Sequence, residues 1–195
     1  KSITSGRIVP PFLLLLASDD PQLQLQNARR LVAARFPAQP PLWRDNTYKH
    51  DRIRLAYISS DFNNHAVASQ IAALVEQHDR ARFEVLAIST GADDGSLQRQ
   101  RLMAAFDRFE DVRGQDAAAI AALIRGLEVD LLGGLNGHTE HDNLDVLRRR
   151  PGPAQATWLG FGGTTGAPFM DAAVVDAMVA PDAAVFSEKL CRRPD

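Results

Sequence analysis

The chain has 195 residues, of which 45% are apolar and 24% charged, and its formal net charge is −2. This length and composition are typical of a folded globular protein with one main domain, and they argue against disorder over most of the chain. The small negative charge argues against a nucleic-acid binder held by bulk electrostatics, and the longest apolar run, Phe12 to Ala17, is too short to span a membrane.

The single cysteine, Cys191, excludes an intrachain disulfide and is typical of a protein from the reducing cytoplasm. We therefore expect a cytoplasmic location. The chain begins at Lys1 and stops at Asp195 without a terminal element of its own. We expect it to be a segment of a longer protein.

Residues 1–50 differ in pattern from the rest of the chain, and we interpret them as a short helical connection and linker. Asp20 followed by Pro21 predicts a helix start, and the apolar face of this helix is formed by Leu25, Ala28, Val32 and Phe36. Pro37, Pro40 and Pro41 end the helix and begin an extended linker. The run Phe12–Leu16 is expected to pack on a neighbouring element.

Strands and helices alternate over residues 51–195. The predicted strands are Ile53–Ile58, Phe83–Ile88, Phe109–Val112, Val129–Leu135, Ala154–Gly160 and Ala172–Asp176. The predicted helices are one with Val67, Ile71, Leu74 and Val75 on its apolar face, one capped by Ser96 with Leu97, Met103 and Phe106 on its face, Asp116–Gly126, and Asp142–Arg149. This alternation predicts an α/β fold with a doubly wound, mainly parallel, Rossmann-like sheet.

Three loops that follow predicted strands share an unusual polar and glycine-rich composition. They are Ser59–His65, Asn136–Thr139 and Gly160–Gly166. The carboxyl ends of parallel strands lie at one edge of a sheet, which is where open α/β sheets bind ligands. The sequence therefore predicts a site with acid-base and oxyanion-binding groups at this edge.

Each of these motifs also has a purely structural interpretation. The glycine-rich loop has no Lys after its glycines and does not match a dinucleotide fingerprint, so alone it indicates a tight turn. A single histidine such as His65 is more often a helix-start or surface residue than a catalyst. His138, His141 and Asp142 fall below the usual standard for a metal site, and we expect no metal.

A set of motifs in order along residues 52–190 resembles the catalytic region of the O-GlcNAc transferase family. The resembling pieces are Arg54–Phe62 with His65, Asp93–Gly95, Leu135–Thr139, Arg149–Gln155, Trp158–Phe161, Gly163–Ala167, Phe169–Asp171 and Ser187–Leu190. The resemblance implies a two-domain GT-B glycosyltransferase that follows a helical repeat region. Residues 51–195 would be its N-terminal catalytic domain, ending before the C-terminal domain that holds most of the UDP.

The resemblance also implies roles for particular residues. His65 matches the active-site histidine of the family, as general base or as a close positioner of acceptor and donor. Asn136 and Thr139 match positions that contact the acceptor or support the donor, and Gly163, Thr164 and Thr165 would shape the cleft floor. The implied reaction is a metal-independent, inverting transfer of a sugar, N-acetylglucosamine, from a UDP-sugar to Ser or Thr of a protein or peptide acceptor, with no cofactor, nucleic acid or membrane involved.

The chain departs from the family pattern at three positions, which leaves alternatives open. Gly134 stands where many bacterial relatives carry an acid, Gly162 where a Pro is usual, and Ala172 where an aromatic residue follows Met-Asp. Fine specificity therefore stays open, and so does activity. The alternatives are a non-catalytic Rossmann-like interaction or regulatory module, a related transferase that adds glucose to Asn, and a sugar-nucleotide epimerase. We expect the segment alone to bind UDP weakly and to be inactive.

Overall fold

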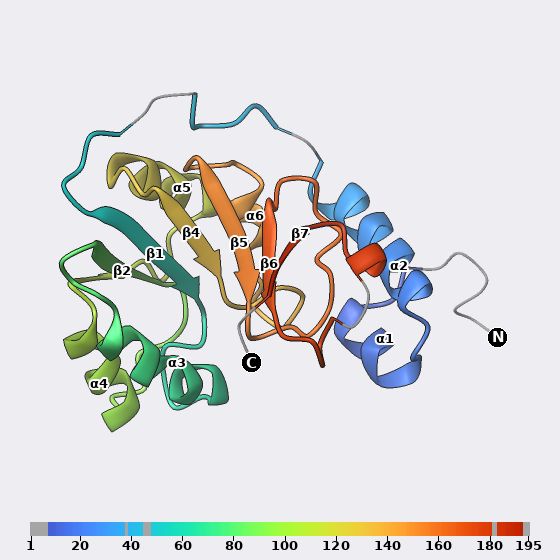
Figure 1. Cartoon of the computed structure of the whole chain (residues 1–195), viewed down its shortest axis with the longest axis horizontal. Coiled ribbons are helices and arrows are strands. Elements are labelled where there is room, and N and C mark those ends of the chain that lie inside the picture. The colour runs from blue at the N-terminus through green and yellow to red at the C-terminus, as the bar shows by residue number, and fades with distance from the viewer. Residues whose placement is uncertain (1–7, 38, 45–47, 181–182, 193–195) are drawn as a thin grey trace.

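The structure, a computed structural model, describes residues 8–37, 39–44, 48–180 and 183–192, and it contains one parallel sheet with helices on both faces (Figure 1). The strands are β1 (Ile53–Ser59), β2 (Phe83–Ser89), β3 (Arg108–Asp111), β4 (Leu131–Gly134), β5 (Ala154–Trp158), β6 (Ala172–Val175) and β7 (Lys189–Arg192). The helices are α1 (Pro11–Ala17), α2 (Pro21–Arg35), α3 (Ala66–Gln77), α4 (Leu97–Ala105), α5 (Ala117–Gly126), α6 (Leu144–Leu147) and the 3₁₀ turn η2 (Ala183–Val185). The predicted α/β class and parallel sheet are confirmed.

The sheet has the strand order β3-β2-β1-β4-β5-β6-β7, and every neighbouring pair of its strands is parallel. The chain first builds outward from β1 to β3 and then returns to place β4 on the other side of β1. The direction of winding therefore reverses between β1 and β4. In open α/β sheets a ligand-binding crevice forms at the carboxyl ends of the strands that flank such a reversal.

The strand β1 is buried on both faces because its side chains alternate between two cores. Leu55 and Tyr57 pack with α3 and α4, whereas Ala56 and Ile58 pack with α5, α6 and the end of α2. An apolar run without polar alternation is what a strand covered on both faces requires. The doubly wound arrangement predicted from the alternation of elements is thus confirmed.

Side-chain caps start several helices at the predicted places. Asp20 accepts hydrogen bonds from the backbone N–H groups of Gln22 and Leu23, Ser96 accepts from Arg99, and Asp116 accepts from Ala119. Each cap satisfies backbone donors that have no partner within the helix. The predicted α2 is confirmed, and its Leu31, Val32 and Phe36 belong to the same core as β1.

Two predicted helix faces were partly wrong. On α3, Leu74 is 41% exposed, and on α4, Leu97 and Met103 are 83% and 47% exposed. The buried face of α4 carries Arg99 and Leu102 instead. Arg99 faces the interior, where it bonds Phe62, Ser89 and Asp111, and Leu97 and Met103 lie on the exposed side of α4.

Other differences concern the ends of elements. The structure adds β7, which the sequence did not predict, and α6 is one turn where a helix over Asp142–Arg149 was expected. In the apolar run Phe12–Leu16, which forms part of α1, Leu14 is buried, but Phe12, Leu13 and Leu16 are 45%, 54% and 76% exposed. Packing of this run on a neighbouring element is therefore confined to one side of the helix.

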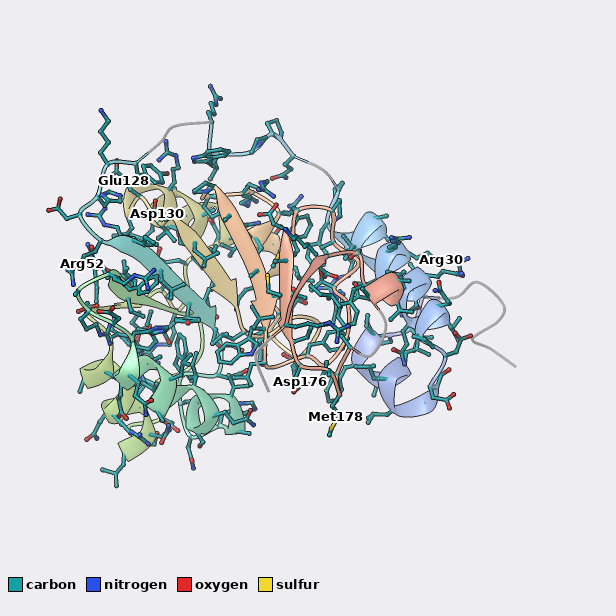
Figure 2. All side chains as sticks on the ribbon, viewed as in Figure 1. Arg30, Arg52, Glu128, Asp130, Asp176 and Met178 are labelled. Atoms are coloured by element: carbon teal, nitrogen blue, oxygen red, sulfur yellow. The ribbon has the colours of Figure 1, made fainter. Side chains whose placement is uncertain are left out.

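The two edges of the sheet are easily told apart in Figure 2. Arg52, Glu128 and Asp130 lie just before β1 and β4 and so mark the amino edge, while Asp176 and Met178, which follow β6, mark the carboxyl edge. The loops predicted to carry the chemistry follow β1, β4 and β5. They therefore all start at the carboxyl edge.

Candidate active site

The loops after β1, β4 and β5 meet at the carboxyl edge, as predicted. The loops after β1 and β4 are joined by the buried side chain of Asn136, which bonds both Ser60 and Asp61. The loop after β5 is joined to that after β4 because Gly160 donates its backbone N–H to Leu135 O at 3.1 Å. The three segments therefore form one connected wall at the reversal point of the sheet.

Asn136 is 1% exposed and uses both ends of its amide. Its Oδ1 accepts from the Ser60 backbone N–H at 3.2 Å and from Asn143 Nδ2 at 2.9 Å. Its Nδ2 donates to Ser60 Oγ at 2.7 Å and to Asp61 Oδ2 at 2.9 Å, and lies 3.5 Å from Thr139 Oγ1. Such complete pairing suits a buried group that holds loops in place.

His65 lies between two clefts at this edge. The larger cleft has a volume of about 900 Å³ and the smaller one about 630 Å³. Both are lined by Asp61, His65, His141 and Asp142. The His65 side chain is 49% exposed, so the ring is open to a molecule in either cleft.

The opposite walls of the two clefts differ. The larger cleft is closed by the start of α1 and by α2, through residues that include Phe12, Leu13 and Arg35, and it also contains Thr139. The smaller cleft is bounded by the loop after β2 and by α5 and α6, and its lining includes Thr90, Gln115 and Asp145. The contribution of α1 to the site was not predicted from the sequence.

The predicted residues Thr164 and Thr165 are buried and do not line either cleft. Thr164 Oγ1 donates to Glu188 Oε2 at 2.7 Å, and the Thr165 backbone N–H donates to Glu188 Oε1 at 2.7 Å. The hydroxyl of Thr165 bonds the same carboxylate oxygen. Gly163 lies beside Phe161 and Leu15. The structure thus brings His65 and Thr139 together in the larger cleft and places Thr164 and Thr165 in the wall behind it.

Glu188 was not among the predicted site residues, although it belongs to the Ser-Glu-Lys-Leu motif of the resemblance. It is 5% exposed and accepts hydrogen bonds from Thr164, Thr165 and Ser187. A buried carboxylate needs such donors because it loses its hydration. Only the tertiary contact between the loop after β5 and the start of β7 shows why these two motifs occur together.

Arg99 is a second residue whose role was not predicted from the sequence. It is 1% exposed, donates to Phe62 O at 3.0 Å and to Ser89 Oγ at 2.7 Å, and pairs with Asp111 at 2.9 Å. Its spacing from Leu102 and Phe106 is helical and could have indicated the buried face of α4. The bond to Phe62 O anchors the loop that carries His65.

His138 packs into the wall of the larger cleft. Its Nε2 donates to Thr165 O at 2.6 Å, and burial lowers the pKa of its imidazole below the usual value. From the sequence we did not expect His138, His141 and Asp142 to bind a metal ion. Within residues 8–37, 39–44, 48–180 and 183–192, no three His, Cys, Asp or Glu side chains gather closely enough to hold a metal ion.

The positions that depart from the family pattern have different surroundings. A Cβ on Gly134 would lie 3.0 Å from Leu147 Cδ1, so an acidic side chain there would require Leu147 to move. A Cβ on Gly162 would meet nothing within 4 Å. Ala172 lies on β6 and is half-buried. The glycine at position 134 is therefore matched to the packing of α6.

The sequence profile of glycosyl transferase family 41 matches residues 31–195. The chain belongs to this family. The matched residues include the whole sheet, the smaller cleft and the loops that carry His65, Asn136 and Glu188, whereas the part of the larger cleft formed by α1 lies before them. The described part of this family 41 chain contains no helix both long and apolar enough to cross a membrane.

Relatives with curated names include two peptide N-acetylglucosaminyltransferases. The family 41 chain is 33% identical over 201 residues to the probable UDP-N-acetylglucosamine–peptide N-acetylglucosaminyltransferase SEC of Arabidopsis thaliana, covering 95% of this chain and 20% of that protein. It is 35% identical over 150 residues to the UDP-N-acetylglucosamine–peptide N-acetylglucosaminyltransferase of Caenorhabditis elegans, covering 73% and 13%. The chain therefore spans about a fifth or less of these relatives.

The fold is also similar to that of a solved structure. A mutant of the Thermobaculum terrenum O-GlcNAc transferase superposes with a TM-score of 0.80 at 29% sequence identity, covering 93% of this chain and 36% of that one. This similarity extends beyond the sheet, because it includes nearly the whole chain. It agrees with the family 41 assignment.

Proposed function

We propose that the chain is the N-terminal catalytic half of a protein glycosyltransferase that uses a UDP-sugar, with UDP-N-acetylglucosamine as the donor. The observation that carries this proposal is the position of His65, open to two clefts at the carboxyl ends of β1 and β4 in a family 41 fold. The names of the relatives support the choice of donor and of a peptide acceptor.

The proposed reaction is a single displacement with inversion. The oxygen of an acceptor Ser or Thr hydroxyl forms a bond to the anomeric carbon, and the bond from that carbon to the diphosphate oxygen breaks. UDP departs with the electron pair of that bond, and the hydroxyl proton passes to water. Because the enzyme holds acceptor and donor side by side, the reaction does not depend on an encounter between two free molecules. In this proposal N–H and O–H donors, most of them in the C-terminal domain, stabilise the departing diphosphate in place of a metal ion.

The predicted residues have distinct parts in this proposal. His65 contacts the reacting molecules, and Thr139 lines the same cleft. Asn136 acts through the loops that it joins, since its side chain is buried. Thr164 and Thr165 support the cleft from behind through Glu188, and Gly163 lies beside Phe161.

The complete enzyme in this proposal contains more than the present chain. Residues 1–50 connect to preceding helical repeats, residues 51–195 form the N-terminal catalytic domain, and a C-terminal domain supplies most of the UDP contacts. The protein works in the cytoplasm. The chain covers 20% or less of these relatives, which supports the proposal of further domains. The single free cysteine supports the proposed location.

The test is transfer by the full-length protein. Purified protein is incubated with an acceptor-peptide library and UDP-N-acetylglucosamine or UDP-glucose, with and without a chelator, and products are identified by mass spectrometry and anomeric NMR. We expect β-linked N-acetylglucosamine on Ser or Thr, unaffected by the chelator. Transfer of glucose to Asn, or turnover of the UDP-sugar without an acceptor, would contradict the proposal. For the present chain alone, we expect calorimetry to show weak UDP binding.

A further inference from the structure

His65 has two structural roles: it is the N-cap of α3, and it lines both clefts. Its backbone is extended, with φ −135° and ψ 155°, and its Nδ1 accepts a hydrogen bond from the backbone N–H of Val67 at 3.2 Å. A backbone N–H can only donate, so Nδ1 carries no proton in this arrangement. A neutral imidazole with an unprotonated Nδ1 carries its proton on Nε2.

The nearest carboxylate does not reverse this assignment. Asp61 Oδ2 lies 3.8 Å from His65 Nδ1, beyond the usual length of a hydrogen bond. Both carboxylate oxygens already have donors, because Ser60 Oγ bonds Oδ1 at 2.9 Å and Asn136 Nδ2 bonds Oδ2 at 2.9 Å. A carboxylate that prepares a histidine for base catalysis instead accepts the Nδ1 proton and leaves Nε2 free to take another.

Nε2, on the opposite side of the His65 ring, is the nitrogen that a substrate can reach. Nε2 has no hydrogen-bond partner among the residues that the structure describes, and the side chain is 49% exposed between the two clefts. For Nε2 to act as a base, the proton would have to move to Nδ1. That move would leave the Val67 N–H at the start of α3 without its acceptor.

We propose that His65 acts as an N–H donor through Nε2 to an oxygen of the bound substrate, and that it does not accept the proton of the acceptor hydroxyl. The role in transfer rests on the proposed function. The oxygen belongs either to the UDP-sugar or to the acceptor, since both are rich in hydroxyl, carbonyl or phosphate oxygens. The cap on α3 is the device that holds the ring in the donating form.

The proton position can be measured without any activity. The full chain contains five histidines and is labelled with ¹⁵N in histidine alone, and the His65→Asn variant identifies the signals of His65. Two-bond ¹H–¹⁵N spectra at neutral pH should show the proton on Nε2 and a bare Nδ1. A proton on Nδ1 would overturn the proposal. This result stands whether or not the protein transfers sugar.

The role in transfer is tested in the full-length protein with two side chains of equal shape. His65→Gln offers an N–H donor near the position of Nε2 but cannot accept a proton, while His65→Glu can accept one but cannot donate when ionised. We expect the kcat/KM of His65→Gln to exceed that of His65→Glu by about tenfold or more. The opposite order would show that His65 is a base.

A third variant separates the cap from the donor. Asn caps helices as well as any residue but cannot reach the position of Nε2, so His65→Asn should keep the melting temperature and lose about 10²- to 10³-fold in kcat/KM. The substrate whose KM rises, peptide or UDP-sugar, identifies which of them carries the oxygen. Full activity in His65→Asn would overturn the donor role. If the wild type transfers no sugar, the proposed function fails and the spectra alone decide.

Discussion

The side chain of Asn136 holds Ser60 at two points, accepting its backbone N–H at 3.2 Å and donating to its hydroxyl at 2.7 Å. Ser60 is the first residue after β1, and Asn136 lies two residues beyond β4. The two strands flank the point where the winding of the sheet reverses. One buried amide therefore sets the position of the His65 loop relative to the loop after β4.

Replacing Asn136 by Ala should destabilise the protein by about 2–3 kcal/mol, because the Ser60 N–H and hydroxyl lose buried partners. Urea unfolding of the purified chain measures this. The matched control is Asn64→Ala in the neighbouring loop, where the side chain is exposed and the cost should be within about 0.5 kcal/mol. Equal costs at the two positions would show that the Asn136 network is not what holds the loops.

Arg99 and Arg101 offer a test of buried against exposed ion pairing on one helix. Arg99 is buried and bonds Phe62, Ser89 and Asp111, so Arg99→Ala should cost about 3 kcal/mol. Arg101 pairs with Glu76 at the surface, where solvent screens the pair, and Arg101→Ala should cost much less than Arg99→Ala. Chemical denaturation compares the two. A larger loss for Arg101 would contradict the structural role of Arg99.

Gly160 and Gly162 flank Phe161 and should respond differently to the same change. A Cβ on Gly160 would lie 2.0 Å from the carbonyl oxygen of Leu135, whereas one on Gly162 would meet nothing within 4 Å. Gly160→Ala should therefore destabilise the protein by about 3 kcal/mol and Gly162→Ala by less than about 0.5 kcal/mol. Thermal unfolding distinguishes them, and a harmless Gly160→Ala would disprove the close approach of these two loops.

The stability of the protein should fall in mild acid because of buried histidine. Burial lowers the pKa of His138. Burial also lowers the pKa of His78, and the positive charge of the nearby Arg80 lowers it further. The unfolded chain, with histidine pKa values of about 6.5, then binds more protons than the folded chain. The free energy of unfolding therefore decreases as the pH falls below about 6.5 toward the folded pKa values.

The contribution of His138 can be isolated with His138→Gln, which does not titrate. Urea unfolding between pH 5 and pH 8 should show a smaller acid loss in this variant than in the wild type. The remaining loss is expected from His78. Parallel pH curves for the two proteins would mean that His138 is not protonated differently in the folded and unfolded chains.

Much of the fold was predictable because local patterns carry it. The apolar run Ile53–Ile58, the caps Asp20, Ser96 and Asp116, and the alternation of strands and helices led to the parallel sheet without any knowledge of distant contacts. The boundaries of α6 and the existence of β7 were not predictable in this way. A four-residue strand with exposed ends is defined by its pairing with β6, which is not a local property.

By itself, the sequence determined the class of fold, the three polar loops and the edge of the sheet where they meet, because strand direction and loop order follow from local periodicity. The tertiary structure alone decided what each polar side chain does. It turned Arg99 inward, buried Thr164 and Thr165 against Glu188, and set the His65 ring on the Val67 N–H. A hydrogen bond depends on positions within tenths of an ångström, and those positions are set only when distant segments pack together.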